Sequence, residues 1–459
     1  MNFLKEDLLD LVQKYNVPGP RYTSYPTAVQ FSEEFDDAQL EENYQRRRES
    51  SNPLSLYIHI PFCFSLCWYC GCTKIITKDQ NRGDVYLNYL EKEMLMISET
   101  IHPKAQLKQI HFGGGTPTFL KPEQIRRLGK LINNHFSLQD DVEFSVEIDP
   151  RTCSEEQIIA LKEIGCNRAS LGVQDTNEEV QKAIRRIQPF EVTKEVTGQL
   201  RKHGINSINF DLIYGLPKQT LSSFKQTIED VVSLQPDRFA IYSYAHIPSI
   251  MPSQKLLNEA EFPSTQDKLG MLVHAIERLP DFGYSYIGMD HFAKDTDELS
   301  IALNEGTLQR NFQGYSTNAE LEMIALGMSS ISQGPDLYIQ NDKDLTTYYN
   351  KLDSGKLPVK KLAHLTDEDK IRKAVIMYIM CRGGINFDDI SEKLGISFRD
   401  HFSQELEQLK QLEADGLLLL MPTGFNITPI GRLFLRNIAM VFDEYLTKAR
   451  HKAAYSKTV

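Results

Sequence analysis

The sequence predicts an α/β fold: a partial, TIM-like (β/α)6 barrel with an N-terminal arm and a mainly helical, winged-helix-like C-terminal domain. Two observations support this prediction. From about residue 54, six short β-rich segments alternate with helical ones, and such alternation implies parallel strands with right-handed crossovers. The chain has 459 residues, too many for one ordinary core. A doubly wound open sheet fits the same alternation and stays an alternative.

The pattern divides the chain into four segments. We expect an N-terminal helix and extended arm in residues 1–50, the barrel in 51–250, a barrel extension and connecting segment in 251–358, and the helical domain in 359–459. The first segment contains YNVPGPRYTSYPTAVQF, with prolines at positions 18, 20 and 26. Proline at this density is incompatible with a helix and favours an extended arm.

The barrel strands are short runs rich in β-branched and aromatic residues, and each ends in polar residues or glycine. We expect strands at LSLYIHI (54–60), LKQIHF (107–112), VEFSVEI (142–148), RASLGVQ (168–174), SINFDLIY (207–214) and RFAIYSY (238–244). The helices between them are expected at 83–100, 121–136, 154–164, 190–203 and 220–234.

Chemically distinctive residues follow these strands. Barrels of this type carry their chemistry at the carboxyl ends of the strands. Those ends hold Cys63, Cys67 and Cys70, then GGGT (113–116), Glu147, Gln174, Asp211 and the stretch from Tyr244 to His246. A functional site at this end of the barrel is therefore expected.

The rest of the chain, from residue 250 onward, shows a less regular pattern. Residues 250–355 are expected to be irregular and helical. Further on, helices and the segment DGLLLLMPTGFNITPIGRLFLRNI (415–438) predict a helix–turn–helix with a two-stranded wing. Many winged helices bind DNA, but residues 360–459 hold 15 Lys and Arg against 13 Asp and Glu. This balance favours a structural lid over a DNA reader.

Composition narrows the class of protein. With 41% apolar and 25% charged residues, the chain is typical of globular proteins. No apolar run is long enough to cross a bilayer, and the N-terminal residues resemble neither a signal nor a transit peptide. We therefore expect a cytoplasmic protein without disulfides. The net charge of −11 argues against nucleic-acid binding.

Four of the seven cysteines lie within CFSLCWYCGC (63–72). A helical stripe of buried cysteines is disfavoured by the flanking Pro61 and Gly71. A redox pair in CWYC leaves Cys63 and Cys72 unexplained, and structural zinc usually needs two separated C-x-x-C pairs. A bridge from Cys70 to Cys72 would be strained. Three thiolates on one loop instead suit an iron–sulfur cluster that keeps one iron open.

At this point the chain resembles the radical S-adenosylmethionine superfamily, which is defined by this cysteine triplet. Longer segments are more specific: KYNVPGPRYTSYPTA, YIHIPFC, CGCTKIIT, HFGGGTPTFL, VEIDPR, LGVQD, FDLIYGLP, IGMDHFAK and RNFQGYST. Together they are similar to the oxygen-independent coproporphyrinogen III oxidases (dehydrogenases) of haem biosynthesis, along essentially the whole chain.

The resemblance implies an activity and its partners. It implies a cytoplasmic, monomeric radical enzyme that converts two propionates of coproporphyrinogen III to vinyl groups, giving protoporphyrinogen IX without oxygen. It further implies a [4Fe–4S] cluster with one open iron, two molecules of S-adenosylmethionine, and an electron donor such as flavodoxin or ferredoxin. A related haem chaperone that binds haem without turnover is the alternative, and a radical enzyme that methylates or opens haem is a weaker one.

The resemblance also assigns residues. Cys63, Cys67 and Cys70 match the cluster ligands. Contacts to the cluster-bound S-adenosylmethionine match Tyr57, Gly114, Glu147 and Ile331. Contacts to the second S-adenosylmethionine match Tyr69, Gly115, Thr116, Gln174, Arg186, Asp211 and Ala245, with Tyr69 standing where the family pattern has phenylalanine.

Three further residues are hypotheses from chemistry. The carboxylates of the substrate need cationic partners, for which Arg21 on the arm and Arg310 are candidates. Cys72 is expected not to bind the cluster, because a fourth thiolate would close the open iron. An extended chain would point Cys72 away from Cys70. We therefore expect it beside the second S-adenosylmethionine or the substrate radical, where it tunes the reaction, or simply buried as a small apolar residue.

Overall fold

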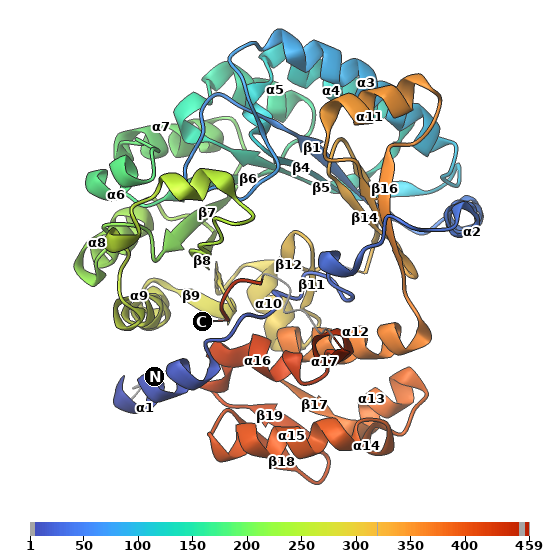
Figure 1. Cartoon of the computed structure of the whole chain (residues 1–459). Helices are drawn as coiled ribbons and strands as arrows, with labels where there is room; N and C mark the ends of the chain where they lie inside the picture. The colour runs from blue at the N-terminus through green and yellow to red at the C-terminus, as the bar shows by residue number, and fades with distance from the viewer. Residues whose placement is uncertain (1–4, 319, 449–454, 459) are drawn as a thin grey trace.

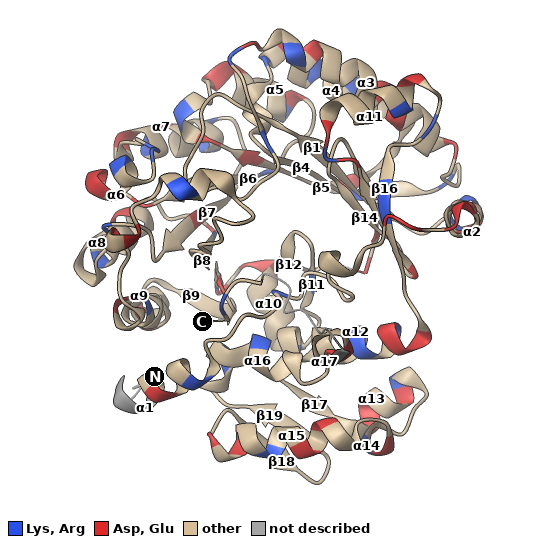
Figure 2. Ribbon diagram, in the orientation of Figure 1, with Lys and Arg blue, Asp and Glu red and all other residues tan. Residues whose placement is uncertain are grey.

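The computed structural model describes residues 5–318, 320–448 and 455–458. A curved sheet with helices on its outer face forms the upper part of the molecule in Figure 1, and the C-terminal domain lies below its open side. Figure 2 shows that positive and negative side chains are interspersed over the outer helices. No described helix is both long and apolar enough to span a membrane.

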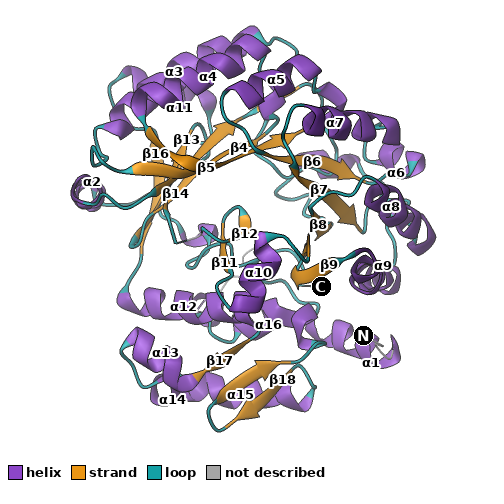
Figure 3. Cartoon of the chain, turned by 180° about the vertical axis from the view of Figure 1, so that it is seen from behind, coloured by secondary structure: helices purple, strands orange, loops and turns teal. Residues whose placement is uncertain are grey.

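The predicted barrel is present. Its six strands are parallel and adjacent in chain order. They are β1 (Leu54–Ile60), β4 (Gln106–Gly114), β5 (Ser137–Ile148), β6 (Arg168–Gln174), β7 (Ser207–Tyr214) and β8 (Arg238–Ser243). The crossover helices cover the outer face (Figure 3). They are α3 (Asn81–Ser98), α4 (Pro122–His135), α5 (Glu155–Glu163), α6 (Glu178–Ala183), α7 (Phe190–Lys202) and α8 (Leu221–Ser233).

Local signals set the starts of these helices. Ser154 precedes α5 and accepts a hydrogen bond from the backbone N–H of Gln157, whose side chain accepts one from the Ser154 N–H in return. Thr220 and Ser223 form the same reciprocal cap at α8. Each cap satisfies backbone donors that the first helical turn leaves free.

The interior of the barrel is polar. Along β7 the buried residues Ile208, Phe210 and Leu212 alternate with the less buried Asn209 and Asp211. Successive side chains on a strand point to opposite faces, so the apolar set packs against the outer helices and the polar set faces inward. A complete TIM barrel fills its centre with branched apolar side chains, whereas this polar inner face leaves room for a cavity.

The expectation of an irregular segment in residues 250–355 was wrong. This part extends the barrel sheet on both sides to twelve strands among the described residues. The added strands are β9 (Tyr284–Gly288) and β10 (His291–Lys294) next to β8, and β13 (Glu322–Leu326), β14 (Ile331–Gln333), β15 (Leu337–Asn341) and β16 (Val359–His364) next to β1. Most are only three to five residues long, too short for a clear alternating pattern.

This part also contributes three helices and a hairpin. Helix α10 (Glu298–Glu305) and the hairpin of β11 (Gln309–Asn311) and β12 (Gly314–Ser316) lie at the open side. Helix α9 (Thr265–Arg278) packs beside α8, and α11 (Leu345–Asp353) packs beside α3 on the outer face. Figure 1 places α10 and the hairpin between the sheet and the C-terminal domain.

The C-terminal domain has the predicted helices and wing. The helices are α12 (Asp367–Arg382), α13 (Phe387–Leu394), α14 (Phe398–His401), α15 (Ser403–Ala414), α16 (Leu435–Met440) and α17 (Glu444–Lys448). The wing strands β18 (Leu418–Met421) and β19 (Gly424–Ile427) are joined by a third short strand, β17 (Gly384–Asn386), which was not predicted.

The N-terminal arm packs on this domain. It follows α1 (Lys5–Tyr15) and precedes α2 (Asp37–Glu49). Tyr22 and Tyr25 are buried in the same apolar core as Phe434 and Phe442 of the C-terminal domain. The predicted extended arm is therefore confirmed, and it ties the two ends of the chain together.

Candidate active site

The cysteine loop leaves the end of β1. Cys63 lies in β2 (Phe62–Cys63), which pairs in parallel with β3 (Ile75–Ile76) and so holds the two ends of the loop together. The Sγ of Cys63 lies 3.4 Å from the Oγ1 of Thr116 in the GGGT segment. Burial raises the pKa of the Cys63 thiol to about 11, an effect that a bound cation would oppose.

Two arginines surround Cys67. The Nη2 of Arg151 lies 3.4 Å from the Cys67 Sγ, and the Nη1 of Arg186 lies 3.7 Å from it. Asp149 joins both arginines, with a 2.6 Å contact to Arg151 and two of 3.1 Å to Arg186. Burial alone would raise the pKa of Asp149, but the charge of Arg186 and the charge and hydrogen bonds of Arg151 together outweigh burial and lower that pKa.

This donor set fits an iron–sulfur cluster. Three thiols lie on one loop, and guanidinium N–H groups point at one sulfur, as hydrogen bonds do that stabilise cluster thiolates. Within the described ranges, no three His, Cys, Asp or Glu side chains form a group that could hold a metal ion. In a cubane each thiolate binds a different iron, so the thiols need not converge on one point.

Cys72 lies beside Cys70. The Cys72 thiol hydrogen bonds with the Cys70 thiol, and this contact, opposed by burial and assisted by Lys74, lowers the pKa of Cys70 to about 6. The expectation that Cys72 points away from Cys70 was therefore wrong. Residues two apart in an extended chain lie on the same face, so extension would not separate them, and residues 68–72 turn in any case. Cys72 is nevertheless exposed, and it lines the barrel cavity described next.

A cavity of about 500 Å³ occupies the inside of the barrel. We call it the barrel cavity. Five of the residues predicted from the family pattern line it, together with Cys72: Tyr57, Gly114, Glu147, Asp211 and Ile331. The structure thus gathers side chains from β1, β4, β5, β7, β14 and the cysteine loop around one space.

The register of β1, β4 and β5 aligns three side chains in the wall of the barrel cavity. Tyr57 pairs with His111, which pairs with Ser145, so the three side chains form a row across β1, β4 and β5. The rings of Tyr57 and His111 stack with centroids 5.8 Å apart. The His111 Nε2 lies 3.3 Å from Glu147 Oε1, while the Gly114 N–H donates to Glu147 Oε2 at 3.1 Å.

The glycines of the GGGT segment are required by close contacts. Gly114 has φ +114°, and a Cβ there would lie 2.6 Å from the His59 ring. A Cβ on Gly115 would lie 2.7 Å from the backbone of Pro61. Side chains at either position would push β4 away from the cysteine loop.

Asp211 sits deeper in the barrel cavity. It accepts hydrogen bonds from Ser170 Oγ at 2.8 Å and from Asn209 Nδ2 at 2.9 Å. Burial, reinforced by the charge of Glu147, raises the pKa of Asp211 to about 7. Near neutral pH, both the neutral and the ionised form of this carboxyl group are therefore populated.

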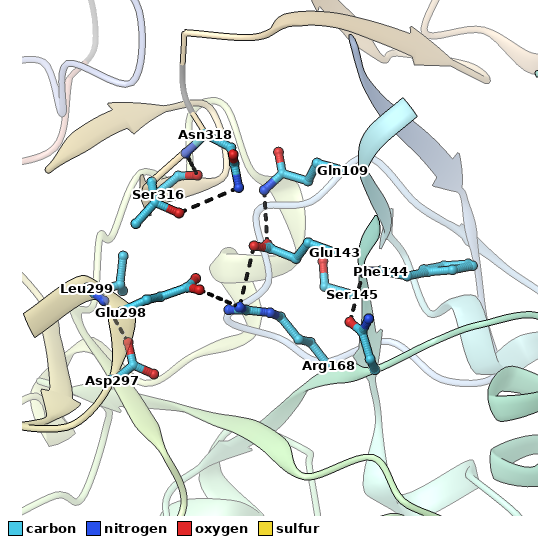
Figure 4. A network of polar contacts seen from close by, with 12 residues as sticks. Gln109, Glu143, Phe144, Ser145, Arg168, Asp297, Glu298, Leu299, Ser316 and Asn318 are labelled. Atoms are coloured by element: carbon cyan, nitrogen blue, oxygen red, sulfur yellow. Dashed lines mark hydrogen bonds and ion pairs between the residues drawn. The ribbon is translucent and has the colours of Figure 1, made fainter. Parts of the chain in front are cut away.

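An ionic network closes the bottom of the cavity (Figure 4). Arg168 lies 3.5 Å from Glu143 and 2.8 Å from Glu298, which comes from α10. Gln109 donates to Glu143 at 3.0 Å. Arg238 links the same Glu298 to Asp297, the N-cap of α10. These ion pairs hold the start of α10 against the bottom of the barrel.

The remaining predicted contacts lie around the rim. Gln174 ends β6 with φ +69°, a conformation rare for a non-glycine residue. Arg186 donates to the Gly172 carbonyl at 2.7 Å, while its buried Nε has no partner among the described residues. Tyr69 is tied to Ala245 through Gln254, whose Nε2 donates to both backbone carbonyls at 3.0 and 3.1 Å.

The two candidate substrate arginines line different cavities, although both lie close enough to act on Asp290 and Tyr242 electrostatically. Arg21 forms an ion pair with the buried Asp290 and lies over the Tyr242 ring, 5.4 Å from its centroid. Arg310 lies 4.7 Å from the centroid of the Tyr315 ring and does not line the barrel cavity. Its Nε and Nη1 are buried without a partner among the described residues.

Comparison with known proteins identifies the family. Residues 57–231 match the Radical SAM superfamily model, and residues 365–434 match the HemN C-terminal domain. The chain is 46% identical over 439 residues to the oxygen-independent coproporphyrinogen III oxidase of Pseudomonas aeruginosa, covering 95% of each chain. The chain belongs to the oxygen-independent coproporphyrinogen III oxidase family. The Escherichia coli member is 42% identical over 451 residues, 98% of each chain.

The fold agrees with this family. A solved structure of the coproporphyrinogen III oxidase from Escherichia coli, described as a radical SAM enzyme, matches with a TM-score of 0.91 and 41% identity. The match covers 95% of this chain and 98% of that one. The predicted fold class, family and enzyme class are confirmed.

The sequence interpretation missed several site residues of this family member. Asp149 and Arg151 were read only as part of the segment VEIDPR, yet they position Arg186 and contact Cys67. Their place directly after β5 was the available signal. His111 was not predicted as a site residue either, although the alternation along β4 points its side chain into the barrel.

Proposed function

We propose that this protein converts two propionate side chains of coproporphyrinogen III to vinyl groups without oxygen, giving protoporphyrinogen IX for haem biosynthesis. In each half-reaction a hydrogen atom leaves the β-carbon of a propionate. The resulting substrate radical loses carbon dioxide and passes one electron to an acceptor, which leaves a carbon–carbon double bond. The observation that carries the proposal is the cysteine triplet at the mouth of a polar barrel cavity, in a chain of this family.

The cysteine loop would hold a [4Fe–4S] cluster through Cys63, Cys67 and Cys70. When bound, such a cluster with an open iron supplies the electron that cleaves S-adenosylmethionine to a 5′-deoxyadenosyl radical. Arg151 and Arg186 donate to the Cys67 sulfur, and hydrogen bonds to the sulfurs are one way in which a protein tunes such a cluster. Their charge is largely balanced by Asp149.

The inner face of the barrel would bind S-adenosylmethionine. Tyr57 and Ile331 supply apolar contact surface, and Glu147 supplies a carboxylate for the ammonium group, next to the close backbone of Gly114. Asp211, when ionised, accepts hydrogen bonds from hydroxyl groups such as those of a ribose. The ion pair of Arg168 and Glu298 keeps the bottom of the cavity closed to water.

A second S-adenosylmethionine would lie at the rim. The residues proposed for it are Tyr69, Gly115, Thr116, Gln174, Arg186, Asp211 and Ala245. The unpartnered Nε of Arg186 is an available donor for a carboxylate there. Cys72, on the wall of the barrel cavity, is proposed to act on the substrate radical without binding the cluster. A small electron-transfer protein such as flavodoxin or ferredoxin is the proposed donor, and a cytoplasmic monomer the proposed state.

The test is an anaerobic assay after cluster reconstitution, with coproporphyrinogen III, S-adenosylmethionine and a reductant. We expect one cluster per chain and release of 5′-deoxyadenosine together with protoporphyrinogen IX. Release of 5′-deoxyadenosine without any decarboxylated porphyrinogen would exclude coproporphyrinogen III as the substrate, while still indicating radical S-adenosylmethionine chemistry. Tight haemin binding without turnover would indicate a haem chaperone instead.

A further inference from the structure

A second cavity lies on the other side of β8 from the barrel cavity. It has a volume of about 440 Å³ and is bounded by the arm, the ends of β7 and β8, α9, α16 and residues 455–458. Figures 1 and 3 both place the C-terminal end of the chain between β9 and α16 at this position. We call this space the cationic cavity, because of the charges in its wall.

The wall of the cationic cavity has a large excess of positive charge. Its cations are Arg21, Lys268, Arg432, Arg436 and Lys457, and its one carboxylate is Asp290. Asp290 is already paired with Arg21 and lies 2.9 Å from His291. The chain as a whole has a net charge of −11, so the positive charge of this wall does not follow from the average composition of the protein.

The protein itself does not neutralise these cations. Arg436 is buried and donates only to backbone carbonyls and one hydroxyl, including those of Pro20 and Lys457 at 2.8 Å. Arg432 donates to the carbonyls of Tyr286 and Ile287. Among the described residues, Lys268 and Lys457 form no ion pair; burial and the charge of Lys457 lower the pKa of Lys268.

Uncompensated charge of this kind is costly at Arg436, which is buried, unless an anion binds; Arg21, Lys268 and Arg432 are half-buried, and Lys457 is exposed. Taking a cation out of water has a large desolvation cost, which proteins normally offset with a carboxylate. The ligand of the proposed reaction is a tetracarboxylate on an apolar macrocycle. The tyrosines that also line the cavity, Tyr214, Tyr244, Tyr286 and Tyr455, present the apolar faces that such a ring would contact.

The position of the cationic cavity decides which carboxylates it can hold. Tyr242 faces the barrel cavity and the next residue, Ser243, faces the cationic cavity, so β8 separates the two spaces. The proposed contacts of the cluster-bound S-adenosylmethionine, among them Tyr57 and Glu147, lie on the barrel side. Of the contacts proposed for the second molecule, Asp211 lies on the barrel side and Ala245 lines the cationic cavity. A propionate that reacts must reach the barrel side, whereas one that stays intact need not.

We propose that the cationic cavity binds the two propionates of the tetrapyrrole that are not decarboxylated. Lys268, Arg432, Arg436 and Lys457 are its anchors, together with Arg21. This inference rests on the proposed function. It adds the residues that hold the substrate and the orientation in which they hold it, with the retained carboxylates away from the barrel.

Two stable porphyrins test the proposal. Coproporphyrin III carries all four propionates, and protoporphyrin IX carries only the two that do not react. The variant Lys268→Gln/Lys457→Gln removes two cations that hold no other part of the protein. Binding to the reconstituted protein is followed anaerobically by porphyrin fluorescence. We expect roughly tenfold weaker binding of both porphyrins, the scale of lost hydrogen bonds to charged groups.

The controls separate this inference from the proposed function. Lys130→Gln/Lys225→Gln removes two exposed lysines from the outer helices α4 and α8 and should leave both affinities unchanged. Lys268→Arg/Lys457→Arg should restore both. Weaker binding of coproporphyrin III alone would assign the cavity to the reacting propionates and overturn the proposal. Unchanged binding of both porphyrins would also overturn it. If the unmodified protein neither binds porphyrins nor converts coproporphyrinogen III, the proposed function itself fails.

Discussion

The two cavities beside β8 differ in charge. The barrel cavity is lined by four carboxylates, Glu143, Glu147, Asp211 and Glu298, against two arginines, Arg168 and Arg238. The cationic cavity has five cations against Asp290. S-adenosylmethionine is a sulfonium cation, and the tetrapyrrole is a polyanion. The difference teaches that a single strand can separate two cavities of opposite charge, as the proposed binding of a cation on one side and a polyanion on the other requires.

The largest expected effect concerns the cysteine loop. Cys67→Ser should lose the cluster and all turnover, because it removes a ligand that two arginines support. Cys72→Ser should keep its iron and its cluster spectrum, yet turn over porphyrinogen roughly 100-fold more slowly, the scale of a positioned catalytic group.

Both cysteine variants should bind coproporphyrin III as the unmodified protein does, since neither residue lines the cationic cavity. Iron content, absorbance spectra and the turnover rate are measured side by side. Equal loss of iron in both variants would make Cys72 a ligand, and normal turnover of Cys72→Ser would make it a packing residue.

The second expected effect concerns the arm. Arg21→Gln should weaken coproporphyrin III binding about tenfold and leave the apparent KM for S-adenosylmethionine unchanged. It also leaves Asp290 buried without its arginine, so thermal unfolding is measured beside binding. Arg21→Lys keeps the charge and should recover much of the affinity. An unchanged affinity in a folded Arg21→Gln protein would remove the arm from the substrate site.

The third expected effect concerns pH. Since burial raises the pKa of Asp211 to about 7, this carboxyl is mostly protonated at pH 6 and ionised at pH 8. Only the ionised form accepts hydrogen bonds with both oxygens. The affinity for S-adenosylmethionine should therefore rise several-fold from pH 6 to pH 8. In Asp211→Asn the affinity should be low and independent of pH. A variant that retains the full pH dependence would assign it to another group.

The smallest expected effect concerns a carboxyl group remote from both cavities. Glu93 on α3 accepts hydrogen bonds from Tyr348 at 2.6 Å and from the Gly327 N–H at 2.8 Å. Burial raises its pKa from 4.5 to about 7. The folded protein therefore holds this proton more tightly than the unfolded chain, and stability falls as pH rises through this window.

Urea unfolding at pH 5 and pH 8 checks this sign. The midpoint should be higher at pH 5, and Glu93→Gln should reduce the difference between the two pH values, whereas Glu195→Gln on the exposed face of α7 should not. If Glu93→Gln kept the parent pH dependence, the carboxyl would be ionised throughout. Ligand binding should not change, in contrast to Asp211→Asn.

The barrel and the cysteine site were predictable because their signals are local. Each barrel strand is a contiguous run followed by its helix, and the triplet of cysteines lies within eight residues. The extension of the sheet was not predictable. It depends on β13, a strand of only five residues that pairs with β1, some 270 positions earlier in the sequence. Register and pairing of that kind are set by packing in the folded chain and not by a local pattern.

The cationic cavity was unpredictable for the same reason. Its five cations come from the arm, α9, the segment around α16 and the last described residues. In the sequence each of them looks like an ordinary surface charge. Only Arg21 was suspected, from the chemistry of the substrate, and its partner Asp290 lies 269 positions away.

The meeting of the two ends of the chain has a consequence for synthesis on the ribosome. Gly19 bonds to Ser456 at 3.0 Å and Thr458 to Val17 at 2.9 Å, so the wall of the cationic cavity joins some of the first residues translated to some of the last. At roughly 5–20 residues per second, the arm waits tens of seconds for its partner. The cysteine loop is translated by residue 72 and the last barrel strand by residue 243. A nascent chain therefore has all six barrel strands translated well before the wall of the cationic cavity can form.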